Sequence, residues 1–188
     1  LGKDVLYQST VLASLRTNFG VFLTVQNSAT GQITLITARQ LLIAIEPTAA
    51  NTAPLNLSGD ECAVLSKFTF THEFTAIINN TALQAPIAYS NLPSTAAPDN
   101  YQILPNMPFT NVITYLGGDN LFKVIIVGDE TLTESGARAL LQNNYNTLLS
   151  QGDLGHTGTQ EAVSYVEFNV HGAMHARVSP EDVTAGFF

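Results

Sequence analysis

Apolar and polar residues alternate along two stretches near the start of the chain. Every second residue from 21 to 25 is aliphatic, and residues 32–37 repeat this period of two. Residues 27–31 between them contain Asn, Ser, Thr and Gly, which favour turns. The pattern predicts a β-hairpin, preceded by a further strand within residues 5–15.

A different pattern follows at residues 41–45, where Leu-Leu-Ile-Ala-Ile forms an uninterrupted aliphatic run before Glu46-Pro47. Such a run suits a strand that is covered on both faces, as in a parallel sheet. Parallel neighbours are made by crossover connections, and no βαβ pattern precedes this run. We therefore expect its partner strands to come from polypeptide outside this sequence.

Residues 66–172 predict an antiparallel sheet with one main helix. Between residues 68 and 78, Phe, His, Ala and Ile alternate with residues that are mainly Thr and Glu, which predicts a long half-buried strand. Residues 112–127 form a second hairpin pattern around a Gly-Gly-Asp-Asn turn, and residues 162–170 predict a final strand. A capping pattern at residues 131–134 begins an amphipathic helix. The fold class predicted is α+β, an antiparallel sheet backed by a main helix.

Two shorter segments complete this outline. Ser58 and Glu61 form a capping-box pattern that predicts a short helix, in which Cys62 is expected as a small buried hydrophobe. Residues 85–110 hold five of the eight prolines, so we expect them to run over the surface or to line a pocket.

Composition excludes some partners. The 188 residues carry a formal charge of -8 with only seven Lys and Arg, scattered singly, so nucleic acid is not an expected partner. No aliphatic run is long enough to cross a bilayer. One cysteine excludes an internal disulfide. Two sequons, at Asn56 and Asn79, matter only if the parent enters the secretory pathway, which leaves secreted and cytoplasmic locations open.

The histidines and glycines do not form a recognisable site. His171 and His175 are four residues apart, but the flanking pattern is a strand and not a helix, and no third ligand has a convincing spacing, so no metal site is predicted. His72 lies on the apolar side of its strand and is interpreted as a core histidine. Glycines within residues 152–158 do not have the spacing of a dinucleotide-binding turn.

Three stretches carry a resemblance to a known family: Tyr7 to Arg16 (YQSTVLASLR), Ala38 to Pro47 (ARQLLIAIEP), and Val166 to Phe188 with its VEF, RVSPEDV and GFF segments. The chain resembles the middle of FAD-dependent amine-oxidase-like flavoproteins. The last stretch is similar to a fungal branch that includes cyclopiazonate-dehydrogenase-type enzymes and is related to flavin-dependent polyunsaturated fatty-acid isomerases. The sequence departs from the family pattern at Glu46, where a small residue or Pro is usual.

The resemblance implies an FAD-binding domain interrupted by a substrate domain. Residues 1–47 would be central strands of the FAD domain, residues 48–178 the substrate domain, and residues 179–188 the start of a helix returning to the FAD domain. The backbone at Val11 would face the FAD adenine, and residues Ala44 to Pro47 would end the strand that leaves this domain. The Gly-rich turn for the FAD pyrophosphate is absent from this sequence.

The family also implies the chemistry, in which the flavin ring accepts a hydride while the protein positions the substrate. The substrate would be an amine or an apolar small metabolite, and catalytic residues cannot be assigned from the sequence. Four aromatic residues are candidates for the substrate pocket: Tyr89, Tyr101, Phe109 and Tyr115.

The chain begins at Leu1 without an initiator Met and ends six residues after a helix start at Ser179 to Asp182, so we expect it to be a piece of a longer polypeptide. Its partners would be the rest of that polypeptide and a small-molecule substrate, and domain swapping or homodimerisation could cover its exposed edges. Two alternatives remain open: a non-catalytic secreted or surface binding module, and an independent α+β domain with a ligand pocket and no redox role.

Overall fold

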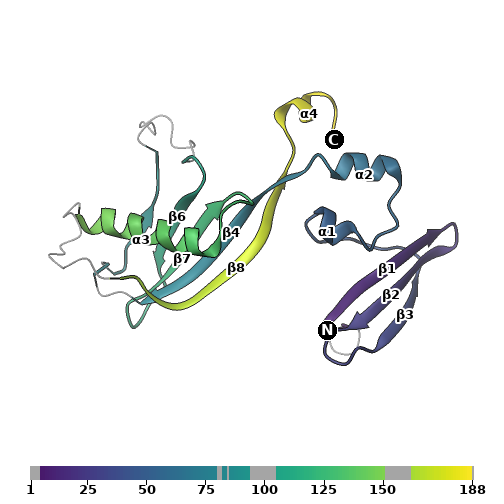
Figure 1. Ribbon diagram of the computed structural model, residues 1–188, viewed down its shortest axis with the longest axis horizontal. Coiled ribbons are helices and arrows are strands. Elements are labelled where there is room, and N and C mark those ends of the chain that lie inside the picture. Colours follow the sequence, from purple (N-terminus) through teal and green to yellow (C-terminus); the bar gives the residue numbers. More distant parts are fainter. Residues whose placement is uncertain (1–4, 80–81, 84, 94–104, 151–161, 188) are drawn as a thin grey trace. The chain divides into compact units, whose positions relative to one another are not determined.

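The computed structural model describes residues 5–79, 82–83, 85–93, 105–150 and 162–187. The chain divides into two compact units, one from residues 1–69 and 176–188, the other from residues 70–175 (Figure 1). Each described unit contains one antiparallel sheet, and the helices are few, which confirms the predicted α+β class. None of the described helices is long and apolar enough to span a membrane.

The first unit contains a three-stranded antiparallel sheet in the order β1-β2-β3. The strands are β1 (Ser9–Thr17), β2 (Gly20–Asn27) and β3 (Ile33–Ala38), which confirms the predicted hairpin and preceding strand. The alternating aliphatic residues of β2, at 21, 23 and 25, form its buried face and pack with Val11, Ile36 and Leu41. The side chain of Asn27 closes the β2–β3 turn, because its Oδ1 accepts hydrogen bonds from the backbone N–H groups of Ala29 and Thr30.

The strand predicted at residues 41–45 is not formed with any described residue. Leu41 packs against the small sheet, but Leu42 is 89% exposed, and Ile43 and Ile45 are also exposed. This agrees with the expectation that its partners lie outside this sequence, because an aliphatic strand of this kind needs a hydrogen-bonded neighbour on each edge and the described residues supply neither; the strand itself stays a prediction.

The rest of the first unit is formed by three short helices, α1 (Ala49–Thr52), α2 (Gly59–Leu65) and α4 (Pro180–Thr184). The predicted capping box of α2 is confirmed: Ser58 Oγ accepts from the N–H of Glu61, and Glu61 Oε2 accepts from the N–H of Ser58. Cys62 is exposed, so its assignment as a buried hydrophobe was wrong. The reason is that α2 buries no residue at all.

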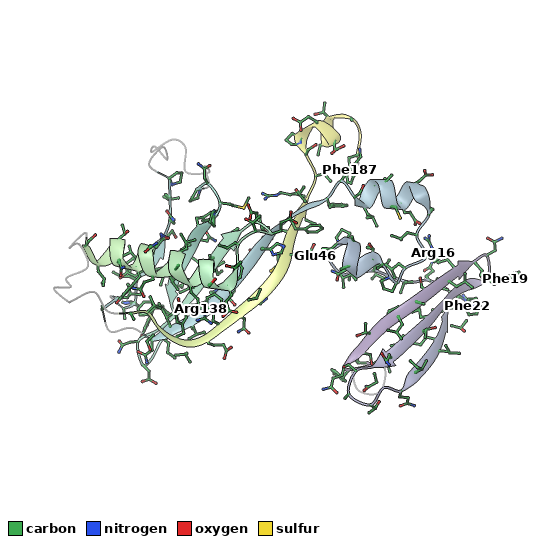
Figure 2. The ribbon with its side chains drawn as sticks, viewed as in Figure 1. Arg16, Phe19, Phe22, Glu46, Arg138 and Phe187 are labelled. Atoms are coloured by element: carbon green, nitrogen blue, oxygen red, sulfur yellow. The ribbon has the colours of Figure 1, made fainter. Side chains whose placement is uncertain are left out.

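An ion pair joins the small sheet to α2. Arg16, labelled in Figure 2, donates from Nη1 to Glu61 Oε1 at 2.7 Å, and its Nε donates to the carbonyl of Asn56 at 2.8 Å. The hydrogen bond from Arg16 is the main reason that the pKa of Glu61 falls to about 2, and the capping bond from Ser58 adds to it. Glu61 therefore stays ionised, and keeps both partners, in mild acid.

The second unit is built on a five-stranded sheet in the order β5-β6-β7-β4-β8. Its strands are β4 (Thr69–Asn79), β5 (Ala88–Ser90), β6 (Phe109–Tyr115), β7 (Leu121–Gly128) and β8 (Ser164–Arg177). These strands confirm the predicted long strand, second hairpin and final strand. The short β5 lies within the Pro-rich stretch, where only a surface path or a pocket was predicted.

One face of this sheet packs against α3 (Glu134–Ser150), which confirms the predicted main helix (Figure 1). The registers Phe74 to Ile126, Ala76 to Val124 and Ile78 to Phe122 place apolar side chains on this face. They pack against a helical stripe of Ala137, Leu141 and Tyr145, all fully buried. This cluster is the main core of the unit.

Arg138 of α3 holds the last strand against the helix (Figure 2). Its guanidinium carbon lies 3.9 Å from the ring centre of Phe168 and 4.5 Å from that of Tyr165, both on β8. Arg138 Nη2 also donates to Glu134 Oε1 at 2.7 Å, one helical turn earlier. The guanidinium therefore lies over two aromatic rings while keeping a carboxylate partner.

Candidate functional site

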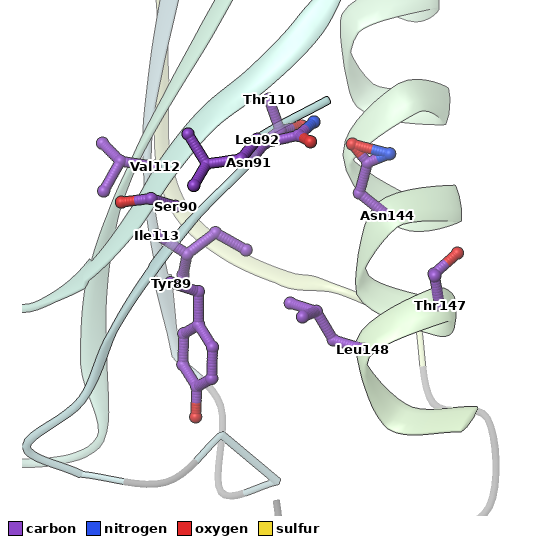
Figure 3. Close-up of a pocket in the computed structure, with 10 residues that line it drawn as sticks. All are labelled: Tyr89, Ser90, Asn91, Leu92, Thr110, Val112, Ile113, Asn144, Thr147 and Leu148. Atoms are coloured by element: carbon purple, nitrogen blue, oxygen red, sulfur yellow. The ribbon is translucent and has the colours of Figure 1, made fainter. Parts of the chain in front are cut away.

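A cavity of about 270 Å³ lies between α3 and the β5–β6 edge of the five-stranded sheet (Figure 3). Its described lining contains no charged side chain. Residues 89–92 contribute from β5 and its continuation, and Thr110, Val112 and Ile113 contribute from β6. The helix contributes residues 144, 147 and 148, which lie on one stripe because positions three and four apart share a helical face.

A bulge in β6 sets the orientation of Thr110. Thr110 pairs with Ile126, but Val112 pairs with Ile125, so one extra residue of β6 interrupts the register between them. Ile126 belongs to the core beneath α3, and Ile113 pairs with Val124 on that same face. The bulge therefore brings Thr110 and Ile113, three residues apart, onto the side of the sheet that faces the helix.

Two polar oxygens in the cavity wall lack hydrogen-bond partners among the described residues: Thr110 Oγ1 and Asn144 Oδ1. Thr110 is only 4% exposed, and both oxygens are closed to solvent. Figure 3 shows the Asn144 side chain extending from α3 toward the strand that carries Thr110. A buried polar atom without a partner costs about 1–3 kcal/mol, and here two such oxygens belong to side chains that line one cavity, which favours a hydrogen-bonding ligand there.

A second polar cluster lies on the face of the sheet that α3 does not cover. Glu73 is only 8% exposed, and its Oε1 lies 3.0 Å from His175 Nδ1. Thr71 Oγ1 donates to the carbonyl of Met174 at 3.1 Å, and Thr75 Oγ1 lies 2.9 Å from His171 Nε2. These contacts link β4 to β8 in antiparallel register.

This cluster corrects one feature of the sequence interpretation. The Thr and Glu side of β4 was expected to be the exposed side of a half-buried strand, yet Thr71 and Glu73 are buried. β8 covers them along one edge, and Phe109 and Val127 lie beside Glu73 in the sheet register. His171 and His175 lie on β8, and among the residues that the structure describes no three potential ligands are grouped to hold a metal ion.

Of the predicted pocket residues that the structure describes, one, Tyr89, lines the cavity. Phe109 is buried on the opposite face of the sheet, next to Val127, and Tyr115 packs on Phe122 with ring centres 5.4 Å apart. Tyr101 lies outside the described residues. A substrate role for these four aromatic residues stays a prediction.

The residues predicted to meet FAD lie in the first unit. Val11 is on β1, an edge strand, beside a bulge that leaves Leu12 without a partner residue on β2. Ala44 and Pro47 belong to the unpaired segment after β3. The carbonyl of Glu46 accepts hydrogen bonds from the N–H of Thr48 and from Asn51 Nδ2, both at 2.8 Å, so this residue helps to begin α1 (Figure 2).

Sequence reasoning missed Thr110 and Asn144. The sequence around Thr110 indicates an ordinary strand residue, because nothing in it predicts the bulge that turns Thr110 toward α3. Asn144 did carry a signal, because it lies on the same helical stripe as Leu141 and Leu148 and is a polar residue at the border of an apolar face.

No known family profile matches the chain. It is 27% identical over 188 residues to a protein named beta-cyclopiazonate dehydrogenase from Aspergillus flavus, an alignment that covers all of this chain and 39% of that protein. It is 26% identical over 195 residues to an FAD-dependent oxidoreductase from Colletotrichum higginsianum, covering 40% of it. The chain thus spans about two fifths of the length of these relatives.

A solved structure has the same fold over most of the chain. The crystal structure of a CLA-producing fatty acid isomerase from P. acnes superposes with a TM-score of 0.66 at 14% identity, covering 95% of this chain and 38% of that one. The two fungal relatives confirm the resemblance to the fungal flavoprotein branch that the sequence predicted, and the solved structure shows the shared fold.

Proposed function

We propose that this chain is the central segment of an FAD-dependent oxidoreductase and that residues 48–178 form most of its substrate domain. The observation that carries the proposal is the extent of the similarity: the match to the fungal dehydrogenase covers the whole chain, both the small sheet and the five-stranded sheet. A relative that shared only a binding module would match one unit and not both.

The division of the chain into two units supports an interrupted domain. Residues 1–69 cluster with residues 176–188, while residues 70–175 form a unit of their own. An inserted substrate domain produces this arrangement, because the polypeptide leaves the first domain and later returns to it. The boundaries between the compact units fall near residues 69 and 176, and the resemblance implies crossings near residues 47 and 178.

The exposed aliphatic run at residues 41–45 also supports the proposal. Leu42, Ile43 and Ile45 project apolar surface that no described residue covers. Covering three aliphatic side chains of this size would contribute roughly 1.5–3 kcal/mol for each one that is fully buried. In the full-length polypeptide, strands of the FAD domain are the proposed partners of this run.

The residues present fit only part of an FAD site. The bulged edge of β1 at Val11 offers backbone groups outside the β1–β2 pairing, in keeping with a contact to the adenine. The sequence holds no Gly-rich turn for the pyrophosphate, so that contact falls to polypeptide outside this chain. FAD, when bound, supplies a flavin ring that accepts a hydride from an amine or an apolar small metabolite.

The visible spectrum of the full-length polypeptide tests this proposal. We expect the purified protein to be yellow, with the two visible absorption bands of oxidised flavin and one FAD released per chain on denaturation. The FAD content is measured against a preparation unfolded and refolded without the cofactor. A colourless protein that has its Gly-rich turn, and that takes up no added FAD, would contradict the proposal.

A further inference from the structure

We infer that the cavity between β5, β6 and α3 binds a small uncharged molecule that carries an N–H or O–H donor on an apolar ring or chain, with a primary carboxamide as the model chemistry. This site lies inside the second unit and on the helix side of its sheet. The inference does not depend on the proposed flavin chemistry.

The need for a donor follows from the two unpaired oxygens. Asn144 Oδ1 can only accept a hydrogen bond, and Thr110 Oγ1 can accept one and donate one. A carboxamide has two N–H donors and one carbonyl acceptor, so it can serve both groups at once. Both oxygens are closed to solvent, so a ligand in the cavity meets them only after rotation of the Thr110 hydroxyl about its side-chain torsion and of the Asn144 amide about its last torsion, which is broad.

The exclusion of charged ligands follows from the lining. The described wall contains no Lys, Arg, Asp or Glu that could pair with an ionised group. A charge placed there would lose its hydration without gaining a partner. Leu92, Ile113 and Leu148 and the ring of Tyr89 instead offer apolar contact to the rest of the ligand (Figure 3).

Size limits the ligand further. A volume of about 270 Å³ lies just below the usual range for ligand pockets, which suits a molecule with one ring.

Benzamide is the probe for the test, with benzoate as the charged control and toluene as the apolar control. Saturation-transfer NMR with the full-length polypeptide should detect benzamide with a Kd of about 1 mM, a value in keeping with about 0.5 kcal/mol for each of its nine heavy atoms. Benzoate should not bind. Toluene should bind more weakly than benzamide.

Thr110→Val is the decisive variant, because it keeps the shape of the side chain and removes only the hydroxyl. We expect its melting temperature to be unchanged or higher, since a buried unpaired hydroxyl is lost, while the Kd for benzamide weakens about tenfold and that for toluene does not change. Asn144→Leu should weaken benzamide binding in the same way. It provides a second measurement of the Kd if one of the two variants folds poorly.

Two results would overturn the inference: no benzamide binding to the wild type, or equal affinities in wild type and Thr110→Val. In either case the oxygens are satisfied by water or by the protein. The flavin spectrum is recorded on the same samples, so a failure of the proposed function is seen separately from a failure of this site.

Discussion

Replacing Phe122 by alanine is expected to lower the free energy of opening of the five-stranded sheet by about 3–5 kcal/mol. Phe122 is fully buried, lies opposite Ile78 in the β4–β7 register, and packs against Tyr115 with the two ring planes tilted by 57°. Its removal leaves a cavity at the centre of the core beneath α3, because the strands on both sides fix the backbone and prevent collapse. Hydrogen exchange of the β4 and β7 amides in the full-length polypeptide measures this loss.

Phe19→Ala is the matched control, because it deletes the same atoms from a side chain that is 92% exposed (Figure 2). We expect this variant to change the opening free energy by less than about 0.5 kcal/mol. Equal losses in the two variants would mean that Phe122 does not lie in a core, and the packing described for α3 would be wrong.

Gly20→Ala is expected to destabilise the small sheet by about 3 kcal/mol, since strain in such a backbone costs about 1–3 kcal/mol and a steric clash is added to it. Gly20 begins β2 with φ of 137°, a conformation that side chains rarely adopt. A Cβ at this position would lie 2.4 Å from the carbonyl oxygen of Ala38, which is backbone and cannot rotate away. The amide hydrogens of β2 and β3 should exchange faster by the factor that corresponds to this loss of free energy.

Gly59→Ala provides the control for the glycine substitution itself. Gly59 begins α2 after the Ser58 cap, and an added Cβ would meet nothing within 4 Å. We expect a gain of about 0.5 kcal/mol, because alanine reduces the freedom of the unfolded chain and favours the helix. If both glycine variants lost stability alike, the close approach of Gly20 to Ala38 would not be the cause.

Local patterns predicted most of the elements, because their information lies within a few residues. The β2–β3 hairpin follows from alternation and a turn rich in Asn and Gly, and the α2 cap follows from Ser58 and Glu61 alone. The core stripe of α3 follows from helical spacing. Each of these features depends only on residues that are close to one another in the sequence.

The features that the sequence predicted less well depend on contacts between residues that are far apart in the chain. Residues 41–45 look like a strand by composition, but a strand also needs partners, and none is described here. Glu73 was expected to be exposed, but β8, about a hundred residues later in the sequence, lies along it. Thr110 faces the cavity only because β6 has a bulge. Of the three predicted aromatic residues that the structure describes, Tyr89 alone lines the cavity, and the substrate role of all four stays a prediction.

The central claim is that residues 1–47 complete their sheet with strands from an FAD domain elsewhere in the polypeptide. Hydrogen exchange of the amides at residues 41–45, in the FAD-loaded full-length polypeptide, tests it most directly. The account predicts slow exchange there, at rates close to those of β2, because both edges of the run would be paired. Fast exchange, with these five residues as open as they are in this chain, would contradict it.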